Sequence, residues 1–202
     1  MAKTFFISDL HLGHTNALKF DNRPFLTIEE HDAEIINRWN KTVSHDDQVY
    51  ILGDVSWHGA ETTISILKRL NGSKHLIAGN HDHNLLKNKD FCEMFCEITD
   101  YKEIRIGASK SDLVLCHYPI LCFNKHYYGA YHFYGHVHNS AEFTFIESAR
   151  IELEDKLKKP CKAINVGCMM PYMGYTPRTF EAIVTGVKNT DGLLSNLREL
   201  CA

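Results

Sequence analysis

Gly79-Asn80-His81-Asp82-His83 comes directly after the apolar run Lys74-His75-Leu76-Ile77-Ala78. Asn71-Gly72 precedes the run and a glycine ends it, which is typical of a buried strand that leads into a tight turn. Because glycine lets the backbone bend without a Cβ clash, the polar side chains of the turn can point into one crevice. On its own, the pentapeptide is equally well explained as an ordinary turn.

Four other stretches repeat this pattern, in which an apolar run is followed by residues of metal-binding type. They are Asp9-Leu10-His11 after residues 4–8, Gly53-Asp54 after residues 49–52, His117 after residues 112–116, and Gly135-His136-Val137-His138 after residues 131–134. On an extended backbone, residues two apart share a face, so the two side chains of each dyad are expected to point together. Carboxylates and imidazoles in that arrangement suit a divalent metal, and for either dyad alone a solvated strand end is the alternative.

Helix signals separate the predicted strands. Thr27-x-x-Glu30 is a capping box that begins one helix, and Asn71-Gly72 ends another over residues 61–70. Strands that alternate with helices and end in ligand-type residues are typical of an α/β sheet with a site at one edge. Residues 161–166 and 180–184 are predicted to be closing strands, and Asp191 is predicted to cap a last helix.

In this order, the stretches resemble the signature of the calcineurin-like metallophosphoesterase superfamily, namely Asp-x-His, Gly-Asp, Gly-Asn-His-Asp/Glu, His and Gly-His-x-His. The likeness runs from about residue 5 to residue 168. Gly13-His14-x-Asn16, followed by Arg23-Pro24-Phe25, is similar to a branch of small bacterial and phage-borne members. The resemblance implies a four-layer α/β/β/α sandwich, with residues 1–202 as a single domain and the charged residues 147–159 as a candidate helical insertion.

The resemblance also implies two divalent metal ions, drawn from Mn²⁺, Fe²⁺, Co²⁺, Ni²⁺ and Zn²⁺. The ligands implied for one ion are Asp9, His11, Asp54 and His138. The ligands implied for the other ion are Asp54, Asn80, His117 and His136, so that Asp54 bridges the pair. Carboxylate, amide and imidazole ligands without a thiolate suit these ions and argue against a structural zinc site.

Such a metal pair acidifies a bridging water, and the resulting hydroxide attacks phosphorus in line with the leaving group. We assign His81 as the acid that protonates the leaving oxygen, because it adjoins ligand Asn80 but points in another direction. Asp82 is expected to orient the turn or a ligand imidazole. The predicted function is hydrolysis of a phosphodiester or a phosphomonoester. The alternative, a catalytically silent interaction scaffold on the same fold, is disfavoured by the complete ligand set.

Two positions depart from the phosphoprotein phosphatases of the superfamily, which carry Gly-Asp-x-x-Asp-Arg-Gly. Trp57 and His58 stand where that motif has its second Asp and its Arg. The departure disfavours a protein phosphatase and leaves His81 without its usual carboxylate partner.

The candidate substrate-binding residues are Asn16, Arg23 and His58. A guanidinium matches phosphate oxygens, but for Arg23 the pinning of its own loop is an equal alternative. His58 and His14 could lie near the metals, but a solvated position in a loop is an alternative for each. The aromatic residues between Tyr118 and Tyr131 either stack on a nucleobase or belong to the core.

Composition bounds the partners of the protein. The formal net charge is −3 and the basic residues are scattered, so a phosphate-ester small molecule or a nucleotide is expected rather than a nucleic-acid footprint. The first apolar stretch is interrupted by Asp9 and His11, and no run approaches the ~20 apolar residues of a membrane span. The 7 cysteines are an odd number, which together with their apolar surroundings favours reduced thiols and a cytoplasmic location.

Overall fold

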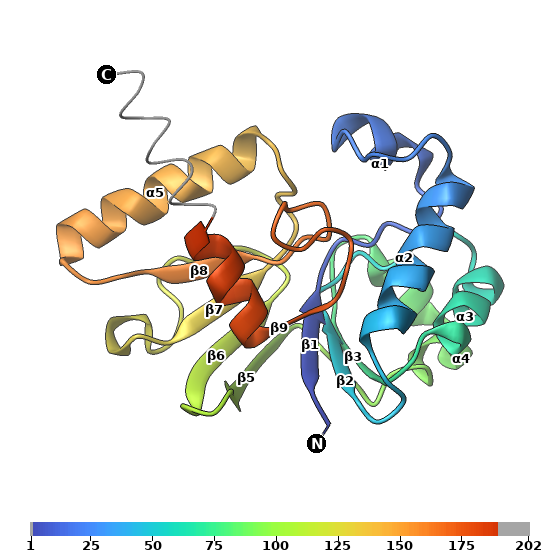
Figure 1. Cartoon of the computed structure of the whole chain (residues 1–202), viewed down its shortest axis with the longest axis horizontal. Coiled ribbons are helices and arrows are strands. Elements are labelled where there is room, and N and C mark those ends of the chain that lie inside the picture. Colours follow the sequence, from blue (N-terminus) through green and yellow to red (C-terminus); the bar gives the residue numbers. More distant parts are fainter. Residues whose placement is uncertain (1, 190–202) are drawn as a thin grey trace.

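Two β-sheets pack together in the computed structural model, which describes residues 2–189 (Figure 1). The first sheet has the strand order β4-β3-β2-β1-β9 and the second has the order β5-β6-β7-β8. The strands of the first sheet are β1 (Thr4–Ile7), β2 (Gln48–Ile51), β3 (Ser73–Ile77), β4 (Glu97–Thr99) and β9 (Arg178–Thr179). Those of the second are β5 (Tyr101–Ile106), β6 (Ser111–Cys116), β7 (Tyr131–Tyr134) and β8 (Lys162–Asn165). Only β9 and β5 run antiparallel to their neighbours, so most strands end at a common edge.

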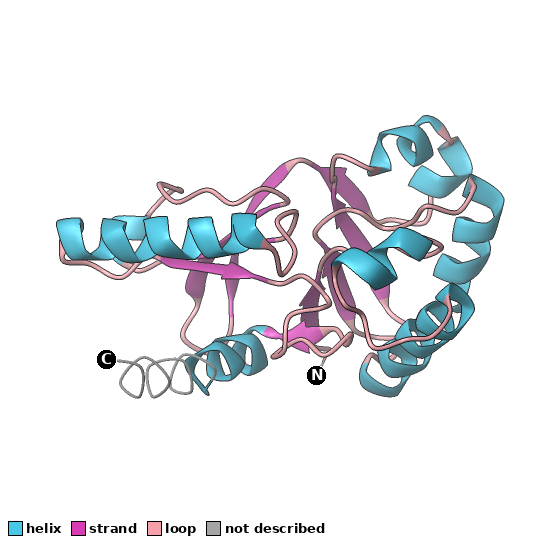
Figure 2. Ribbon diagram, turned by 90° about the horizontal axis from the view of Figure 1, so that it is seen from above, coloured by secondary structure: helices cyan, strands magenta, loops and turns pink. Residues whose placement is uncertain are grey.

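Helices cover the outer sides of the two sheets (Figure 1, Figure 2). The helices beside the first sheet are α2 (Ile28–Thr42), α3 (Ala60–Arg69) and α4 (Lys89–Cys92). Helix α5 (Ala141–Leu157) lies over the second sheet, where its apolar residues pack against a cluster that includes Val114 and Tyr134. The short elements are α1 (Thr15–Phe20) and two 3-10 helices, η1 (Asp82–Lys87) and η2 (His126–Tyr128). The layer order confirms the predicted α/β/β/α sandwich.

The core between the sheets is built on aromatic contacts. Phe6 of β1 meets Phe133 of β7 edge to face, with ring centroids 5.2 Å apart, and both side chains are fully buried. Phe6 also stacks on Tyr50 of β2 at 5.7 Å. These contacts hold the carboxyl ends of β1, β2 and β7 close together, and the residues that follow these strands therefore share one region.

Helix α2 forms where the capping box predicts it. The Thr27 hydroxyl accepts a hydrogen bond from the Glu30 N–H at 3.2 Å, and the Glu30 carboxylate accepts one from the Leu26 N–H at 2.8 Å. The helix buries Ile35 and Trp39 against the first sheet. Charged residues cover its outer face, so an amphipathic pattern decides its orientation.

Two predictions at the carboxyl-terminal end have different outcomes. The closing strand over 161–166 is confirmed as β8, but the strand over 180–184 is wrong because residues 180–189 are helical. Phe180 and Ile183 are both buried at helical spacing, and a short apolar run does not distinguish the two structures. The charged stretch 147–159 lies mostly in α5, which begins earlier, at Ala141. The helix expected after Asp191 lies outside the described residues.

Two findings bear on the expected environment of the protein. Within residues 2–189, no helix combines the length and the apolar character needed to cross a bilayer. The cysteines in that range form no disulfide with one another, and reduced thiols stay a prediction. The cytoplasmic location stays a prediction.

His132 is a buried histidine of β7 that fixes the loop after β6. Its Nε2 accepts a hydrogen bond from the Ile120 N–H at 3.1 Å, and its Nδ1 donates to the Val114 carbonyl at 3.2 Å. Burial lowers the pKa of His132 to about 4, against the weaker opposing effect of the backbone carbonyls. The folded protein therefore holds this imidazole neutral at pH values where an unfolded chain would protonate it.

We expect His132 to make the fold less stable as the pH falls from 7 to 5. The unfolded state binds a proton below its ordinary pKa of about 6.5, whereas the folded state does so only near 4, so protonation favours unfolding in this window. At pH 5 this group alone should lower the free energy of unfolding by about 2 kcal/mol. Urea unfolding at both pH values should show a shallower pH dependence for His132→Gln than for the wild type. His45→Gln, at an exposed loop position, should keep the wild-type dependence, and equal slopes for all three proteins would contradict the prediction.

Candidate metal centre

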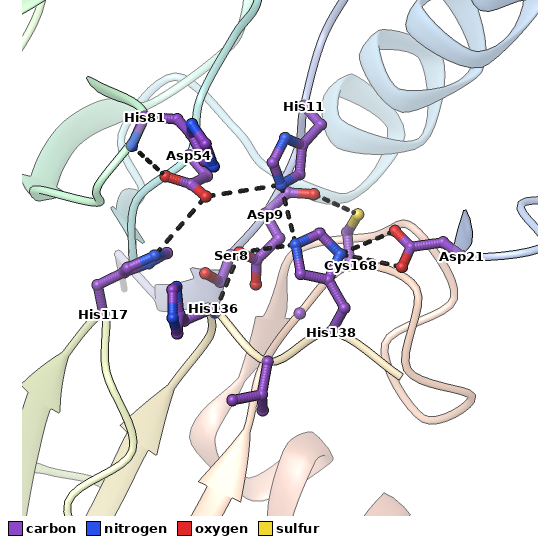
Figure 3. A network of polar contacts seen from close by, with 12 residues as sticks. Ser8, Asp9, His11, Asp21, Asp54, His81, His117, His136, His138 and Cys168 are labelled. Carbon is purple, nitrogen blue, oxygen red and sulfur yellow. Dashed lines mark hydrogen bonds and ion pairs between the residues drawn. The ribbon is translucent and has the colours of Figure 1, made fainter. Parts of the chain in front are cut away.

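The predicted ligand residues all follow strands that end at the same region of the two sheets. Figure 3 shows six of the seven side chains converging from both sheets. They follow the strands in this way: Asp9 and His11 after β1, Asp54 after β2, Asn80 after β3, His117 after β6, and His136 and His138 after β7. The parallel strands of each sheet bring these turns together.

The backbone at five of these positions is left-handed. The φ angles are 55° at Asp9, 50° at His11, 55° at Asp54, 69° at His136 and 51° at His138. Non-glycine residues adopt this conformation at a cost of roughly 1 kcal/mol or more each, and it is concentrated at functional sites. The prediction that the dyads lie on extended backbone is therefore wrong, although their side chains do converge. Strained turns, not the alternation of a strand, aim them.

The first set of ligands is compact and nearly buried. One donor atom from each of its members lies within 4.8 Å of the others, the members being Asp9, His11, Asp54 and His138. The Nε2 atoms of His11 and His138 are 3.1 Å apart, and His138 Nε2 is 3.9 Å from Asp9 Oδ1. Two imidazole nitrogens and two carboxylates that face one another in this way could hold a divalent cation.

The second set of ligands centres on the Asn80 side-chain oxygen. Asn80 Oδ1 lies 3.0 Å from His117 Nε2 and 2.9 Å from His136 Nδ1. Asp54 Oδ2 lies 3.7 Å from His117 Nε2 and 3.6 Å from His11 Nε2. The Asp54 carboxylate therefore lies between the two sets.

The residues present fit a divalent metal. Asp9 Oδ2 is buried, and in the described part of the chain it has no hydrogen-bond partner, which a bound cation would supply. His117 Nδ1 donates to the Leu52 carbonyl at 2.7 Å. His138 Nδ1 donates to Asp21 at 2.9 Å, as Figure 3 shows. Each of these bonds leaves the lone pair of Nε2 facing the cluster.

Burial and neighbouring charges shift the pKa values of three residues in the first set of ligands. Burial, and after it the neighbouring His138, lowers the pKa of His11 well below its usual value. Burial raises the pKa of Asp54, and the nearby Asp9 carboxylate raises it further. For His138, burial lowers the pKa, but the hydrogen bond to Asp21 and the charges of Asp9 and Asp21 together outweigh it, and the net shift is upward. A cation bound among these groups would stabilise the ionised form of the buried carboxylates.

Asp82 ties two of the ligand turns together. It is fully buried, and its carboxylate accepts hydrogen bonds from the backbone N–H groups of Gly79 at 2.9 Å, Asp54 at 3.0 Å and Val55 at 2.9 Å. Burial raises the pKa of Asp82 and the three donors oppose that shift. Of the two predicted roles, the contacts are those of a residue that orients the turn.

Arg23 does not reach over the metal centre. Only 4% of the residue is exposed, and its guanidinium donates to Asp21 at 2.9 Å and to the backbone carbonyls of Asp9 and Leu10 at 3.0 and 2.9 Å. A further hydrogen bond goes to His31 Nε2 at 2.8 Å. The geometry is that of the second alternative, an arginine that pins its own loop, so the substrate-binding assignment for Arg23 is corrected.

The other two candidate substrate-binding residues, Asn16 and His58, lie in different surroundings. Asn16 is exposed on α1. His58 Nε2 donates to Asp32 Oδ2 at 2.7 Å, and its ring packs so tightly on Gly13 that an added Cβ there would lie 2.6 Å from it. His58 therefore links its own loop to helix α2 and to the loop at Gly13, rather than projecting freely into solvent.

Sequence reasoning missed two carboxylates that support the centre. Asp21 accepts the His138 N–H, and Asp32 accepts from His58, from the Gly13 N–H at 3.0 Å and from His31 Nδ1 at 2.8 Å. A signal for Asp32 was present, because it lies four positions before the buried Ile36 on the apolar face of α2. For Asp21 the sequence offers no comparable signal, since its partner is far along the chain.

His81 stands beside the first set of ligands. It is exposed, its backbone N–H donates to Asp54 Oδ1 at 3.0 Å, and its ring centroid lies 6.0 Å from that of His11. The ring also packs on Trp57 at 4.2 Å. The neighbour of His81 is therefore an indole at the position where the phosphatase motif has a carboxylate.

Comparison with known families agrees with this arrangement of strands and ligands. The model of the calcineurin-like phosphoesterase superfamily domain matches residues 3–188. The chain belongs to this superfamily. Membership supports a hydrolase of phosphate esters, and the Asp and His cluster agrees with the divalent metals that the family generally binds.

Individual relatives extend the likeness over most of the chain. An uncharacterised protein of Methanocaldococcus jannaschii is 31% identical over 187 residues, which cover 91% of this chain and 90% of that protein. The Gene 66 protein of Mycobacterium phage L5 is 33% identical over 134 residues, or 59% of this chain and 64% of its own. A crystal structure of an Aquifex aeolicus protein of unknown function is 25% identical and superposes with a TM-score of 0.67, covering 92% of this chain and 99% of that one. The expected similarity to small phage-borne members is confirmed.

Asp82 offers a test of how the turns are held. Asp82→Ala leaves three backbone N–H groups without an acceptor, two of them buried and that of Gly79 half-buried, so the free energy of unfolding should fall by roughly 3 kcal/mol or more. Asp82→Asn keeps one acceptor oxygen, so its free energy of unfolding should fall by less than that of Asp82→Ala. Urea unfolding of metal-free protein measures both, with the exposed Asp46→Ala as a control expected within about 0.5 kcal/mol of the wild type. Stability of Asp82→Ala equal to that control would show that the carboxylate does not hold the turns.

Proposed function

We propose that the protein is a phosphodiesterase that works with two divalent metal ions. The observation that carries the proposal is the position of Asp54 Oδ2, 3.6 Å from His11 Nε2 and 3.7 Å from His117 Nε2. A carboxylate between two sets of ligands is suited to bridge a pair of cations. The unpartnered Asp9 Oδ2 supports the same view, since it belongs to the first set.

When bound, the cations would supply a water acidified to hydroxide near neutral pH and positive charge for the phosphoryl oxygens. Asp9, His11 and His138 would hold one ion, and Asn80, His117 and His136 the other. Asp21 and Leu52 support this by fixing the ring orientation of His138 and His117. Mn²⁺, Fe²⁺, Co²⁺, Ni²⁺ and Zn²⁺ all accept this oxygen and nitrogen donor set.

His81 would complete the reaction as the general acid. Attack of water at phosphorus breaks the bond to the leaving oxygen, and that oxygen takes a proton from the imidazole. His81 is exposed beside the first set of ligands and is held through its backbone N–H to Asp54. This bond links the backbone of His81 to the carboxylate that would bridge the two ions.

A diester fits the surroundings of the centre better than a monoester. A diester carries one negative charge, whereas a monoester carries up to two near neutral pH. The Arg23 cation is buried behind the centre, and His58 is engaged by Asp32, so neither offers a free charge to a phosphate. The alternative of a silent scaffold is disfavoured by a donor set in which every predicted ligand converges.

Hydrolysis by metal-stripped protein resupplied with Mn²⁺, Ni²⁺, Zn²⁺ or Mg²⁺ tests the proposal. We expect metal-dependent turnover, faster with bis(p-nitrophenyl) phosphate than with p-nitrophenyl phosphate, and two ions per chain by elemental analysis. Asp54→Asn should hold fewer than two ions and lose activity by at least about 10³-fold, because both sets share this residue. Asp155→Asn, on the exposed face of α5, is the matched control. Two bound ions without turnover would favour the scaffold.

The role of His81 predicts an effect that depends on the leaving group. His81→Ala should keep both metal ions and lose about 10² to 10⁴-fold in kcat with an alkyl ester. With a p-nitrophenyl ester the loss should be small, since that oxygen leaves without a proton. His45→Ala should match the wild type on both substrates. Equal losses on the two esters would remove His81 as the acid.

A further inference from the structure

Three exposed aromatic side chains surround the metal centre, and they come from separate parts of the chain. Phe20 ends α1, Trp57 lies in the loop after β2, and Tyr118 follows His117 in the loop after β6. Their exposed fractions are 52%, 41% and 45%. We call these three residues the aromatic rim.

Each member of the rim touches ligand imidazoles. The ring of Phe20 lies 5.3 Å from that of His138, and the ring of Trp57 lies 4.9 Å from that of His11, so both border the first set of ligands. Tyr118 borders the second set, with its ring 4.7 Å from that of His136. The rim therefore flanks both sides of the place where a phosphate would bind.

The exposure of these rings separates them from core aromatics. Phe123, in the same loop as Tyr118, is 3% exposed and packs in the cluster under α5, so the core alternative applies to it. The rim residues keep about half of their surface in solvent beside a polar centre. Half-exposed rings around convergent polar groups are typical of sites that bind a flat apolar group together with a charged one.

Trp57 is also fixed in orientation. Its indole stacks on the His14 ring at 3.9 Å with an interplanar angle of 2°, and His81 packs against it at 4.2 Å. Since the ring is already held, little conformational entropy is lost when a second flat group contacts its exposed part. This arrangement favours a recognition surface over a side chain that only fills space.

We propose that the aromatic rim binds the base of a nucleotide-type phosphate ester while the metal centre binds its phosphate. The proposal rests on the proposed function, because the phosphate must lie at the centre for its base to reach the rim. Every base presents a π-face, so stacking of this kind tolerates different bases. A mononucleotide ester and the end of a single strand carry the same base and phosphate chemistry.

Two substrates with one leaving group test the proposal. These are p-nitrophenyl thymidine 5′-phosphate and p-nitrophenyl ethyl phosphate, which have the same charge and differ in the nucleoside. With Mn²⁺-loaded protein we expect kcat/KM to be about tenfold or more higher for the nucleoside ester. Trp57→Leu and Tyr118→Leu should each reduce that preference by about fivefold or more, whereas Tyr128→Leu, at an 89% exposed position, should keep it.

The leaving group is shared, so any effect of Trp57→Leu on His81 cancels in the ratio. Turnover of both esters at equal kcat/KM in every variant would overturn base recognition and leave the phosphodiesterase standing. Lack of turnover with either ester would instead count against the proposed function. Base recognition would then be tested by measuring ligand binding directly.

Fluorescence provides that binding measurement. The chain has 2 tryptophans, and Trp39 is fully buried, so quenching by a ligand at the rim reports on Trp57. Thymidine 5′-monophosphate should quench Mn²⁺-loaded wild type but not Trp57→Leu, and ribose 5-phosphate should quench neither. Equal signals from the two phosphates would overturn the proposal. A short single-stranded DNA that competes better than the mononucleotide would assign the base to a strand end, and weaker competition would assign it to a mononucleotide ester.

Discussion

The metal centre depends on left-handed backbone that only the surrounding hydrogen bonds can hold. Asp9 and His11 have φ angles of 55° and 50°, and Arg23 binds the turn that they form through the carbonyls of Asp9 and Leu10. Asp82 does the same for the turn at Asp54 through three backbone N–H groups. At these two turns a buried charged side chain therefore offsets the strain of the left-handed backbone.

A continuous polar chain connects Arg23 to helix α2. Arg23 donates to His31 Nε2, which must therefore be an acceptor, so the proton of His31 lies on Nδ1 and faces Asp32. Burial lowers the pKa of His31 and keeps it neutral for this role. Asp32 then binds His58. At the other end of this chain of hydrogen bonds, Asp21 binds the ligand imidazole of His138. The packing of α2 and the orientation of the ligand residues therefore depend on each other.

Sequence reasoning succeeded where the information is local and failed where it is not. The strand ends and the capping box at Thr27 follow from neighbouring residues, and the ligand turns were located through strands that end in glycine or polar residues. The partnership of Asp21 with His138 spans most of the chain, so no local pattern contains it. The helix at Phe180 replaced a predicted strand because burial at one face, which decides between the two, is set by packing on Phe133.

The two departures from the phosphatase motif act together on the charge of the site. An indole at Trp57 removes a carboxylate from the path of an anionic substrate, and an imidazole at His58, held by Asp32, removes a guanidinium. One negative and one positive charge are lost, so the balance at the centre changes little while its rim becomes more apolar. The remaining carboxylates, Asp9 and Asp54, face imidazoles at 3.6 to 3.9 Å, and burial raises the pKa of Asp54. Charge in this site is therefore concentrated where cations would bind, and in the proposed function the surface around it would distinguish the organic part of a substrate.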